Sequence, residues 1–166
     1  MPSPEPIKRR MQTERLLCSQ YVAENYPTAR TFIQQYLGPI AVPETTDVLT
    51  YRDKLAIGTG RRRADAVLVL PDKIIIIESY VHVQLGKLSQ LLTYIELIKS
   101  TPELQFAAHL PIFGKLLGAQ RDPILDQMAA KFGIEVIIFK PKWVNDYLAT
   151  VAVRHSRTRR NVDLPA

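Results

Sequence analysis

Hydrophobic positions in the first third of the chain follow helical spacing and then become irregular. Residues 8–25 carry mostly helix-compatible side chains, which predicts a first helix. Residues 28–37 place apolar side chains at i, i+3, i+4, i+7 and i+8, which predicts a second helix that Thr28 can cap. After a loop, residues 47–57 contain a short segment that favours a β-strand.

Two almost continuous apolar runs follow and predict a buried β-hairpin. They span residues 64–70 and 74–77, and residues 71–73 between them form a tight turn. Each strand carries one conspicuous acid, Asp65 near the entry of the first and Glu78 near the exit of the second. Because the strands of a hairpin are antiparallel, both acids should lie at the same end of the sheet.

The second half of the chain alternates helical and strand patterns. Helices are expected over residues 85–99 and 122–132 and from Pro141 onward, with strands over residues 104–110 and 134–139. The expected order is therefore α, α, β, β, β, α, β, α, β, α. We predict an α/β domain with a central mixed β-sheet flanked by helices.

Length and composition indicate one domain with two short appendages. The chain has 166 residues, of which 46% are hydrophobic and 23% charged, enough for one compact core. We expect residues 1–10 to form a basic, proline-containing arm, residues 11–153 the domain, and residues 154–166 a basic tail. The single cysteine, Cys18, excludes an intrachain disulfide and indicates a reducing compartment, which favours the cytoplasm. The apolar runs have only strand length, so no membrane association is expected.

Basic residues are clustered, which suggests an anionic partner. Lys and Arg number 22 against 16 Asp and Glu, a formal net charge of +6. The clusters lie at residues 8–10, at Arg61, Arg62 and Arg63, and at residues 154–160. Such clusters attract the phosphate backbone of DNA without recognising its sequence. The alternative is that each cluster only keeps the domain soluble.

Asp65 and Glu78 need a physical explanation, because a carboxylate in an apolar strand must find a cation or shift its pKa. Two carboxylates at one edge of a sheet are suitable ligands for Mg²⁺ or Mn²⁺. The alternative is that each acid marks the end of a strand and faces water. The sequence alone is compatible with both interpretations.

Residues 61–98 resemble the PD-(D/E)XK nuclease superfamily. The likeness lies in an acid after a basic stretch (Asp65), a hairpin of apolar strands, and a second acid at its end (Glu78). The following helix carries Gln90 and Tyr94, similar to the Gln-x-x-x-Tyr motif of the recombination-exonuclease branch. The resemblance implies a restriction-endonuclease-like αβββαβ core plus a C-terminal helix. It also implies metal ligation by the two acids and DNA contacts by Gln90 and Tyr94.

The signature lysine of that superfamily is missing. It stands two residues after the second acid, where this chain has Tyr80, which is neutral at pH 7. Loss of one transition-state donor typically lowers the rate by about 100-fold to 1,000-fold. Lys87 could take the place of the lysine, because it lies on one helical stripe with Gln90 and Tyr94. The alternative is that Lys87 is an ordinary solvated lysine. The catalytic candidates are thus Asp65, Glu78, Lys87 and Tyr80.

Three further polar residues are weaker candidates. His82 would share a strand face with Glu78 and serve as a proton relay or metal ligand if the strand continued. Glu14 or Glu24 would provide the additional acid that the superfamily often supplies from its N-terminal helix. For each of the three, a role as a polar edge or surface residue is the alternative.

Two functions fit these observations. The first is a catalytically degenerate, DNA-associated structural or assembly protein, such as a component of a phage virion (head or neck), with DNA and other protein chains as partners. Mg²⁺ would then be absent. The second is an active Mg²⁺-dependent DNA nuclease that uses Asp65 and Glu78, with Lys87 as the relocated lysine. The substitution at Tyr80 favours the first function.

Overall fold

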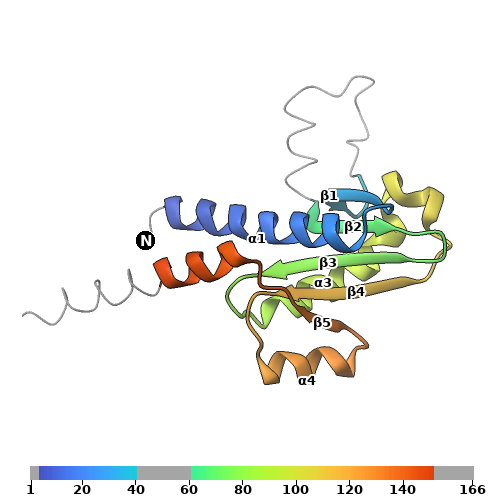
Figure 1. Cartoon of the computed structure of the whole chain (residues 1–166). Helices are drawn as coiled ribbons and strands as arrows, with labels where there is room; N and C mark the ends of the chain where they lie inside the picture. The colour runs from blue at the N-terminus through green and yellow to red at the C-terminus, as the bar shows by residue number, and fades with distance from the viewer. Residues whose placement is uncertain (1–3, 41–60, 152–166) are drawn as a thin grey trace, which may run out of the picture.

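The computed structural model describes residues 4–40 and 61–151, with side chains from residue 12 onward. Within these ranges five strands form one sheet in the order β1-β2-β3-β4-β5 (Figure 1). The strands are β1 (Arg30–Leu37), β2 (Arg62–Val69), β3 (Ile74–Tyr80), β4 (Ile112–Gly118) and β5 (Glu135–Ile138). Strand β2 is antiparallel to its neighbours β1 and β3, whereas β3, β4 and β5 are parallel. This confirms the predicted α/β fold with a central mixed sheet.

Helices connect the parallel strands and cover both faces of the sheet. The helical elements are α1 (Pro4–Asn25), α3 (Gly86–Leu97), α4 (Pro123–Lys131), two short 3₁₀ helices (Ile98–Ser100 and Pro102–Ala107) and a C-terminal helix over residues 142–151. Helix α3 links β3 to β4, and α4 links β4 to β5. The order from α1 to β4 is therefore αβββαβ, as the resemblance implied. None of the helices in the described ranges is long and apolar enough to cross a bilayer.

Strand β3 supplies side chains to two hydrophobic cores, one on each face of the sheet. Ile74 and Ile76 face α3 and α4, whereas Ile75 and Ile77 face α1 and the C-terminal helix. Figure 1 shows α1 and the C-terminal helix side by side over the second face. Since every residue of β3 is buried, its sequence is apolar without alternation until Glu78.

The prediction of a second helix over residues 28–37 is wrong, because these residues form β1. The strand pairs with β2 from Arg30↔Val69 to Leu37↔Arg62. Its β-branched and aromatic side chains favour a strand. As an edge strand it is only partly covered, so its apolar residues need not alternate. Helical spacing over so few residues could therefore arise without a helix.

The predicted strand over residues 104–110 is also wrong. Residues Pro102–Ala107 form a 3₁₀ helix, and the strand begins later, at Ile112. Pro102 occupies the first turn of the helix, where its missing N–H is harmless. Leu104 and Ala107, three residues apart, are both buried. Three-residue spacing brings side chains to one side of a 3₁₀ helix.

The remaining helices and strands agree with the prediction to within a few residues. The hairpin of β2 and β3, the helices α3 and α4, and strand β5 are all confirmed. Asp122 caps α4, since its carboxylate accepts bonds from the backbone N–H groups of Ile124 and Leu125. Helix α1 begins at Pro4, inside the segment assigned to the N-terminal arm. The predicted β-segment at residues 47–57 and the tail at residues 154–166 lie outside the described residues.

Candidate active site

The candidate site lies where β2 and β3 diverge. Their register runs from Val69↔Ile74 to Ala66↔Ile77 and ends there. The next residues along the two strands are Asp65 and Glu78, so the hairpin returns both acids to one end of the sheet. The open end of the hairpin leaves room for polar side chains between the strands.

The carboxylate of Asp65 accepts a hydrogen bond from the backbone of β3, as a backbone carbonyl does in a regular pair of strands. Its Oδ2 accepts a bond from the Ser79 backbone N–H at 2.8 Å and lies 2.5 Å from the Ser79 hydroxyl. Its Oδ1 accepts a bond from Gln34 Nε2 at 2.9 Å. Both oxygens of Asp65 are therefore held by neighbours on β3 and β1. Bonds of this kind to a carboxylate are stronger than those between neutral groups.

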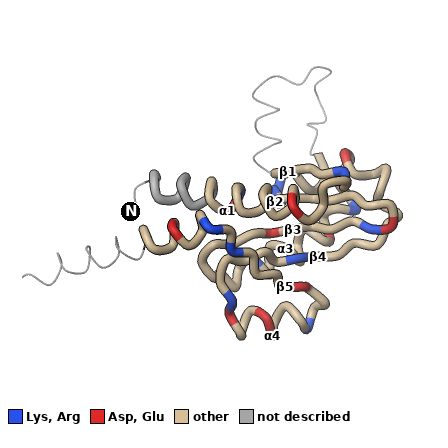
Figure 2. Tube along the Cα trace, in the orientation of Figure 1, with Lys and Arg blue, Asp and Glu red and all other residues tan. Residues whose placement is uncertain are grey.

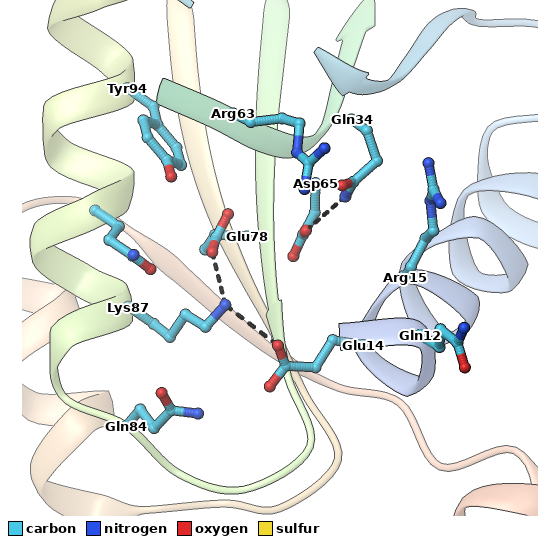
Figure 3. Close-up of a pocket in the computed structure, with 11 residues that line it drawn as sticks. Gln12, Glu14, Arg15, Gln34, Arg63, Asp65, Glu78, Gln84, Lys87 and Tyr94 are labelled. Atoms are coloured by element: carbon cyan, nitrogen blue, oxygen red, sulfur yellow. Dashed lines mark hydrogen bonds and ion pairs between the residues drawn. The ribbon is translucent and has the colours of Figure 1, made fainter. Parts of the chain in front are cut away.

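Glu78 lies in the floor of the site and is bound to Lys87. Only 3% of Glu78 is exposed, and its Oε1 is 2.7 Å from the Lys87 ammonium. The same ammonium is 3.5 Å from Glu14 Oε2. Lys87 projects from the start of α3 and Glu14 from α1, so the lysine links the two helices beside Glu78 (Figure 3).

Burial is the main reason that the pKa of Glu78 is raised from 4.5 to about 7, and repulsion from Asp65 is the second. The charge of Lys87 opposes this change. Burial lowers the pKa of Lys87, but the carboxylates of Glu78 and Glu14 outweigh burial and leave that pKa raised. The lysine is therefore charged at neutral pH, whereas Glu78 is close to its titration midpoint. A cation near Glu78 would favour the ionised carboxylate.

A cavity of about 510 Å³ surrounds these groups. Its walls come from α1, β1, β2, β3 and α3 and the turn before α3 (Figure 3). It is lined by Gln12, Glu14, Arg15, Gln34, Arg63, Asp65, Glu78, Gln84, Lys87, Gln90 and Tyr94. The lining thus contains three acids, three cations, four amides and a phenol. This composition suits a charged, hydrated ligand better than an apolar one.

A second hollow of about 190 Å³ adjoins the first. It is lined by Arg62, Ser89, Gln90, Thr93 and Tyr94. Gln90 and Tyr94 line both hollows, so the two lie next to each other along α3. Among the described residues, those that line the second hollow supply a guanidinium, hydroxyls, an amide and a phenol but no carboxylate.

The structure brings most of the sequence-predicted site residues together. Asp65, Glu78, Lys87, Gln90 and Tyr94 all line the larger cavity. Burial, together with the smaller effect of the negative charge on the nearby Glu78, raises the pKa of Tyr94 to about 12. The phenol is therefore protonated at neutral pH. Of the basic stretch, Arg63 lines the larger cavity and Arg62 the smaller one.

Tyr80 does not belong to this site, and its inclusion among the catalytic candidates is corrected. Its side chain is fully buried in the core beside Gly118 and is absent from the lining of the cavity. Burial raises the pKa of Tyr80 to about 12. The negative charges of Asp126 in α4 and of Asp122 at its N-cap act in the same direction. Its hydroxyl has no hydrogen-bond partner in the described part of the protein. Tyr80 therefore packs between β4 and α4 as a core aromatic residue.

Arg61 is also placed differently from the expectation that it contacts DNA. Its guanidinium forms a two-pronged ion pair with Glu103, at 2.6 and 2.8 Å, and donates to the Tyr36 carbonyl at 3.1 Å. Only 8% of its side chain is exposed. Arg61 ties β1 to the 3₁₀ helix Pro102–Ala107 and is not available to a phosphate without breaking that pair.

The weaker candidates separate into one residue inside the cavity and two outside it. Glu14 lines the cavity beside Lys87. Glu24 is exposed on α1 and accepts a bond from Gln20. His82 is absent from the cavity lining and contacts the Tyr147 ring, with ring centroids 6.4 Å apart.

Four lining residues were not predicted from the sequence, namely Gln12, Arg15, Gln34 and Gln84. Gln12 and Arg15 flank Glu14 on α1, so their proximity to that acid was a usable signal. Gln34 lay in a segment predicted to be helical, which hid that this segment pairs with β2 and brings Gln34 to Asp65.

Asp65 and Glu78 are the residues of this site that would hold a divalent cation. Glu78 Oε2 is buried without a hydrogen-bond partner among the described residues and is thus an unfilled acceptor. No group of three or more His, Cys, Asp or Glu suited to a metal ion occurs in the described part of the chain. Mg²⁺ nevertheless needs only one or two carboxylates, because it keeps several of its waters. Asp65 and Glu78 would supply those carboxylates.

Comparison with known proteins finds only distant structural similarity. No protein-family model matches the sequence, and no curated protein matches it. A repair endonuclease from Pyrococcus abyssi is similar at 14% identity and a TM-score of 0.44 over 76% of this chain and 46% of that chain. A complex of EndoMS with dsDNA is similar at 15% identity and a TM-score of 0.43, over 77% and 45%. A protein of unknown function is similar at 9% identity and a TM-score of 0.46, over 74% and 56%. The chain spans about half the length of these structures.

Proposed function

We propose that the chain is a divalent-metal-dependent DNA nuclease in which Asp65 and Glu78 bind the metal and Lys87 acts as the relocated signature lysine. The observation that carries this proposal is the 2.7 Å contact between Lys87 Nζ and Glu78 Oε1 inside a cavity that Asp65 also lines. A solvated lysine at the start of a helix would not be buried between two carboxylates. The contact therefore favours the second of the two functions that the sequence allowed.

Lys87 has the charge and the donors that the reaction needs. Its pKa is raised by Glu78 and Glu14 against the effect of burial, so the ammonium persists at neutral pH. An ammonium has three N–H donors, and its contacts with the two glutamates do not exhaust them. The remaining donor can bond a phosphate oxygen or orient the attacking water. Stabilisation by one such preorganised donor is typically worth about 100-fold to 1,000-fold in rate.

In this proposal Asp65 and Glu78 make the nuclease dependent on a divalent metal. A Mg²⁺ ion bound by two carboxylates supplies charge neutralisation at the phosphate and a more acidic water. Glu78 contributes an unfilled buried oxygen, and Asp65 contributes a carboxylate held by Ser79 and Gln34. With its pKa of about 7, Glu78 ionises fully only above neutral pH or when a cation is present.

The second hollow supports a path for a DNA strand. Gln90 and Tyr94 line both this hollow and the neighbouring acidic cavity, and Arg62 provides a cation there. The guanidinium of Arg62 and the hydroxyls of Ser89 and Thr93 suit a phosphate next to the one that is cut. In Figure 2 the remaining charges of both signs are interleaved along the described chain. We therefore propose that the DNA contacts concentrate at this groove and read the backbone, not the sequence.

Cleavage assays with matched variants test the proposal. Linear and circular DNA are incubated with Mg²⁺ or Mn²⁺ and wild-type protein, Asp65→Ala, Lys87→Ala or Lys99→Ala. Lys99 is exposed at the far end of α3 and serves as the control. We expect divalent-dependent cutting that Asp65→Ala abolishes, that Lys87→Ala lowers by about 100-fold or more, and that Lys99→Ala leaves unchanged. Equal activity of the two lysine variants would refute the role of Lys87.

The second candidate function is a non-catalytic, DNA-associated assembly protein, for instance in a phage virion. The buried Tyr80 at the signature position favours it. It would be supported if the wild-type protein bound DNA in a salt-sensitive manner but did not cut it with either metal.

A further inference from the structure

Gln34 has an unusual backbone conformation in the middle of β1. Its φ is 56°, and it is the one non-glycine residue with positive φ among the residues that the structure describes. A residue with a side chain adopts this left-handed conformation only at an energetic cost, which neighbouring interactions must offset. Such outliers concentrate at functional sites. The position of Gln34 on the wall of the acidic cavity therefore calls for a reason.

Gln34 lies opposite Asp65, and strand pairing is interrupted at both residues. The register of β1 and β2 includes Ile33↔Ala66 and Gln35↔Ala64, but the intervening pair, Gln34 and Asp65, is missing from it. On its other side, β2 stops pairing with β3 at Ala66. Asp65 is thus outside the regular ladder on both sides, and its carboxylate is not constrained by strand pairing.

The side chains of β2 change the side of the sheet that they face at Asp65. Ala64 belongs to the core under α3, whereas Ala66 belongs to the core under α1. Residues two apart in a regular strand face the same side of the sheet, so β2 rotates at this residue. The rotation gives Asp65 a direction that strand geometry alone would not set.

Side chains replace the missing ladder contacts. Gln34 Nε2 donates to Asp65 Oδ1 at 2.9 Å, and the Ser79 backbone N–H donates to Oδ2 at 2.8 Å. One donor comes from β1 and the other from β3, so the carboxylate is clamped at both oxygens between the two neighbouring strands. Figure 3 shows Gln34 and Asp65 facing each other on the side of the cavity near α1.

We infer that Gln34 is a positioning residue, whose left-handed backbone aims its amide at Asp65 and thereby orients that carboxylate for metal binding with Glu78. The part of this inference that concerns catalysis rests on the proposed nuclease function. The clamp itself does not, because it is a feature of the folded protein. Partners that orient metal ligands typically affect metal affinity or activity by about 10-fold to 100-fold.

Two substitutions at Gln34 separate positioning from stability. Gln34→Ala removes the amide donor but keeps the strained backbone, whereas Gln34→Gly removes the donor and relieves the strain. The matched control is Gln35→Ala. Gln35 is the next residue of β1, donates to the Tyr36 carbonyl, and is absent from the cavity lining.

Three quantities are measured for each variant: kcat and KM for DNA with Mg²⁺, the thermal midpoint Tm, and the amide proton shift of Ser79 by NMR. We expect both Gln34 variants to lose about 10-fold to 100-fold in kcat with KM for DNA little changed. The Tm of Gln34→Gly should be at least that of Gln34→Ala. The Ser79 amide proton should move upfield in both, because a carboxylate released at Oδ1 can rotate out of line with the Ser79 N–H. Gln35→Ala should match the wild type in kcat and in the Ser79 shift.

The outcomes distinguish the positioning role from the nuclease proposal. Wild-type kcat together with an unchanged Ser79 shift in Gln34→Gly would overturn the inference. The inference would also be overturned if the losses of kcat followed the losses of Tm, so that Gln34→Gly had the activity of the wild type. If the wild-type protein does not cut DNA, the nuclease proposal fails, and the Ser79 shift alone decides the clamp: an upfield move supports it and no move overturns it.

Discussion

Replacement of Glu78 by glutamine should change how stability depends on pH. Burial and the neighbouring Asp65 raise the pKa of Glu78 from 4.5 to about 7 in the folded protein. In the unfolded chain the group ionises near its ordinary value. Between these two pH values the folded state holds a proton that the unfolded state has lost, so stability falls as pH rises. At about 1.4 kcal/mol per pH unit, the loss amounts to about 3 kcal/mol by neutral pH.

The glutamine side chain of this variant resembles the protonated form of the acid and cannot ionise. Glu78→Gln should therefore gain about 3 kcal/mol relative to the wild type on going from about pH 4.5 to about pH 7.5. Urea unfolding followed by circular dichroism, repeated at several pH values in that range, measures the gain. The same variant should lose metal-dependent cleavage, because it lacks a carboxylate ligand.

Glu96→Gln is the matched control, because Glu96 lies on the exposed side of α3 and is hydrated in both states. Its stability profile should run parallel to that of the wild type. If the profile of Glu78→Gln is also parallel to the wild type over this range, the argument that burial raises the pKa of Glu78 is refuted.

Three further predictions concern the core and the DNA contacts. Tyr80→Phe removes a buried hydroxyl without a partner in the described structure and should leave stability unchanged or raise it by about 1 kcal/mol, measured as Tm. Gly118→Ala should destabilise the protein by about 1 to 3 kcal/mol in urea unfolding, because the added Cβ would overlap the Tyr80 ring. Arg62→Ala should weaken DNA binding and reduce the salt slope of log K by about 1, whereas Arg61→Ala, whose guanidinium pairs with Glu103, should alter neither.

The hairpin and its acids could be predicted because their determinants are local. An apolar run of strand length, a turn at residues 71–73 and a second apolar run specify the antiparallel pair. The pairing then returns Asp65 and Glu78 to the same end of the sheet. The stripe of Lys87, Gln90 and Tyr94 follows from helical geometry in the same way, because residues three and four apart share a face.

Strand β1 could not be recognised, because its apolar spacing is compatible with either a helix or an edge strand. Its pairing with β2, which is distant in the sequence, decided between them. That misassignment also concealed Gln34, whose role depends on lying across from Asp65.

The sequence by itself determined the α/β class, the position of the two acids and the helical stripe that faces them, since periodicity and turn residues act over short distances. Only the tertiary structure decided that Lys87 bonds Glu78, that Tyr80 is buried beside Gly118, and that Arg61 is paired with Glu103. The last two of those contacts join elements far apart in the chain, and the first depends on how the turn between β3 and α3 is folded. Their geometry depends on how strands and helices pack, which no local pattern of side chains encodes.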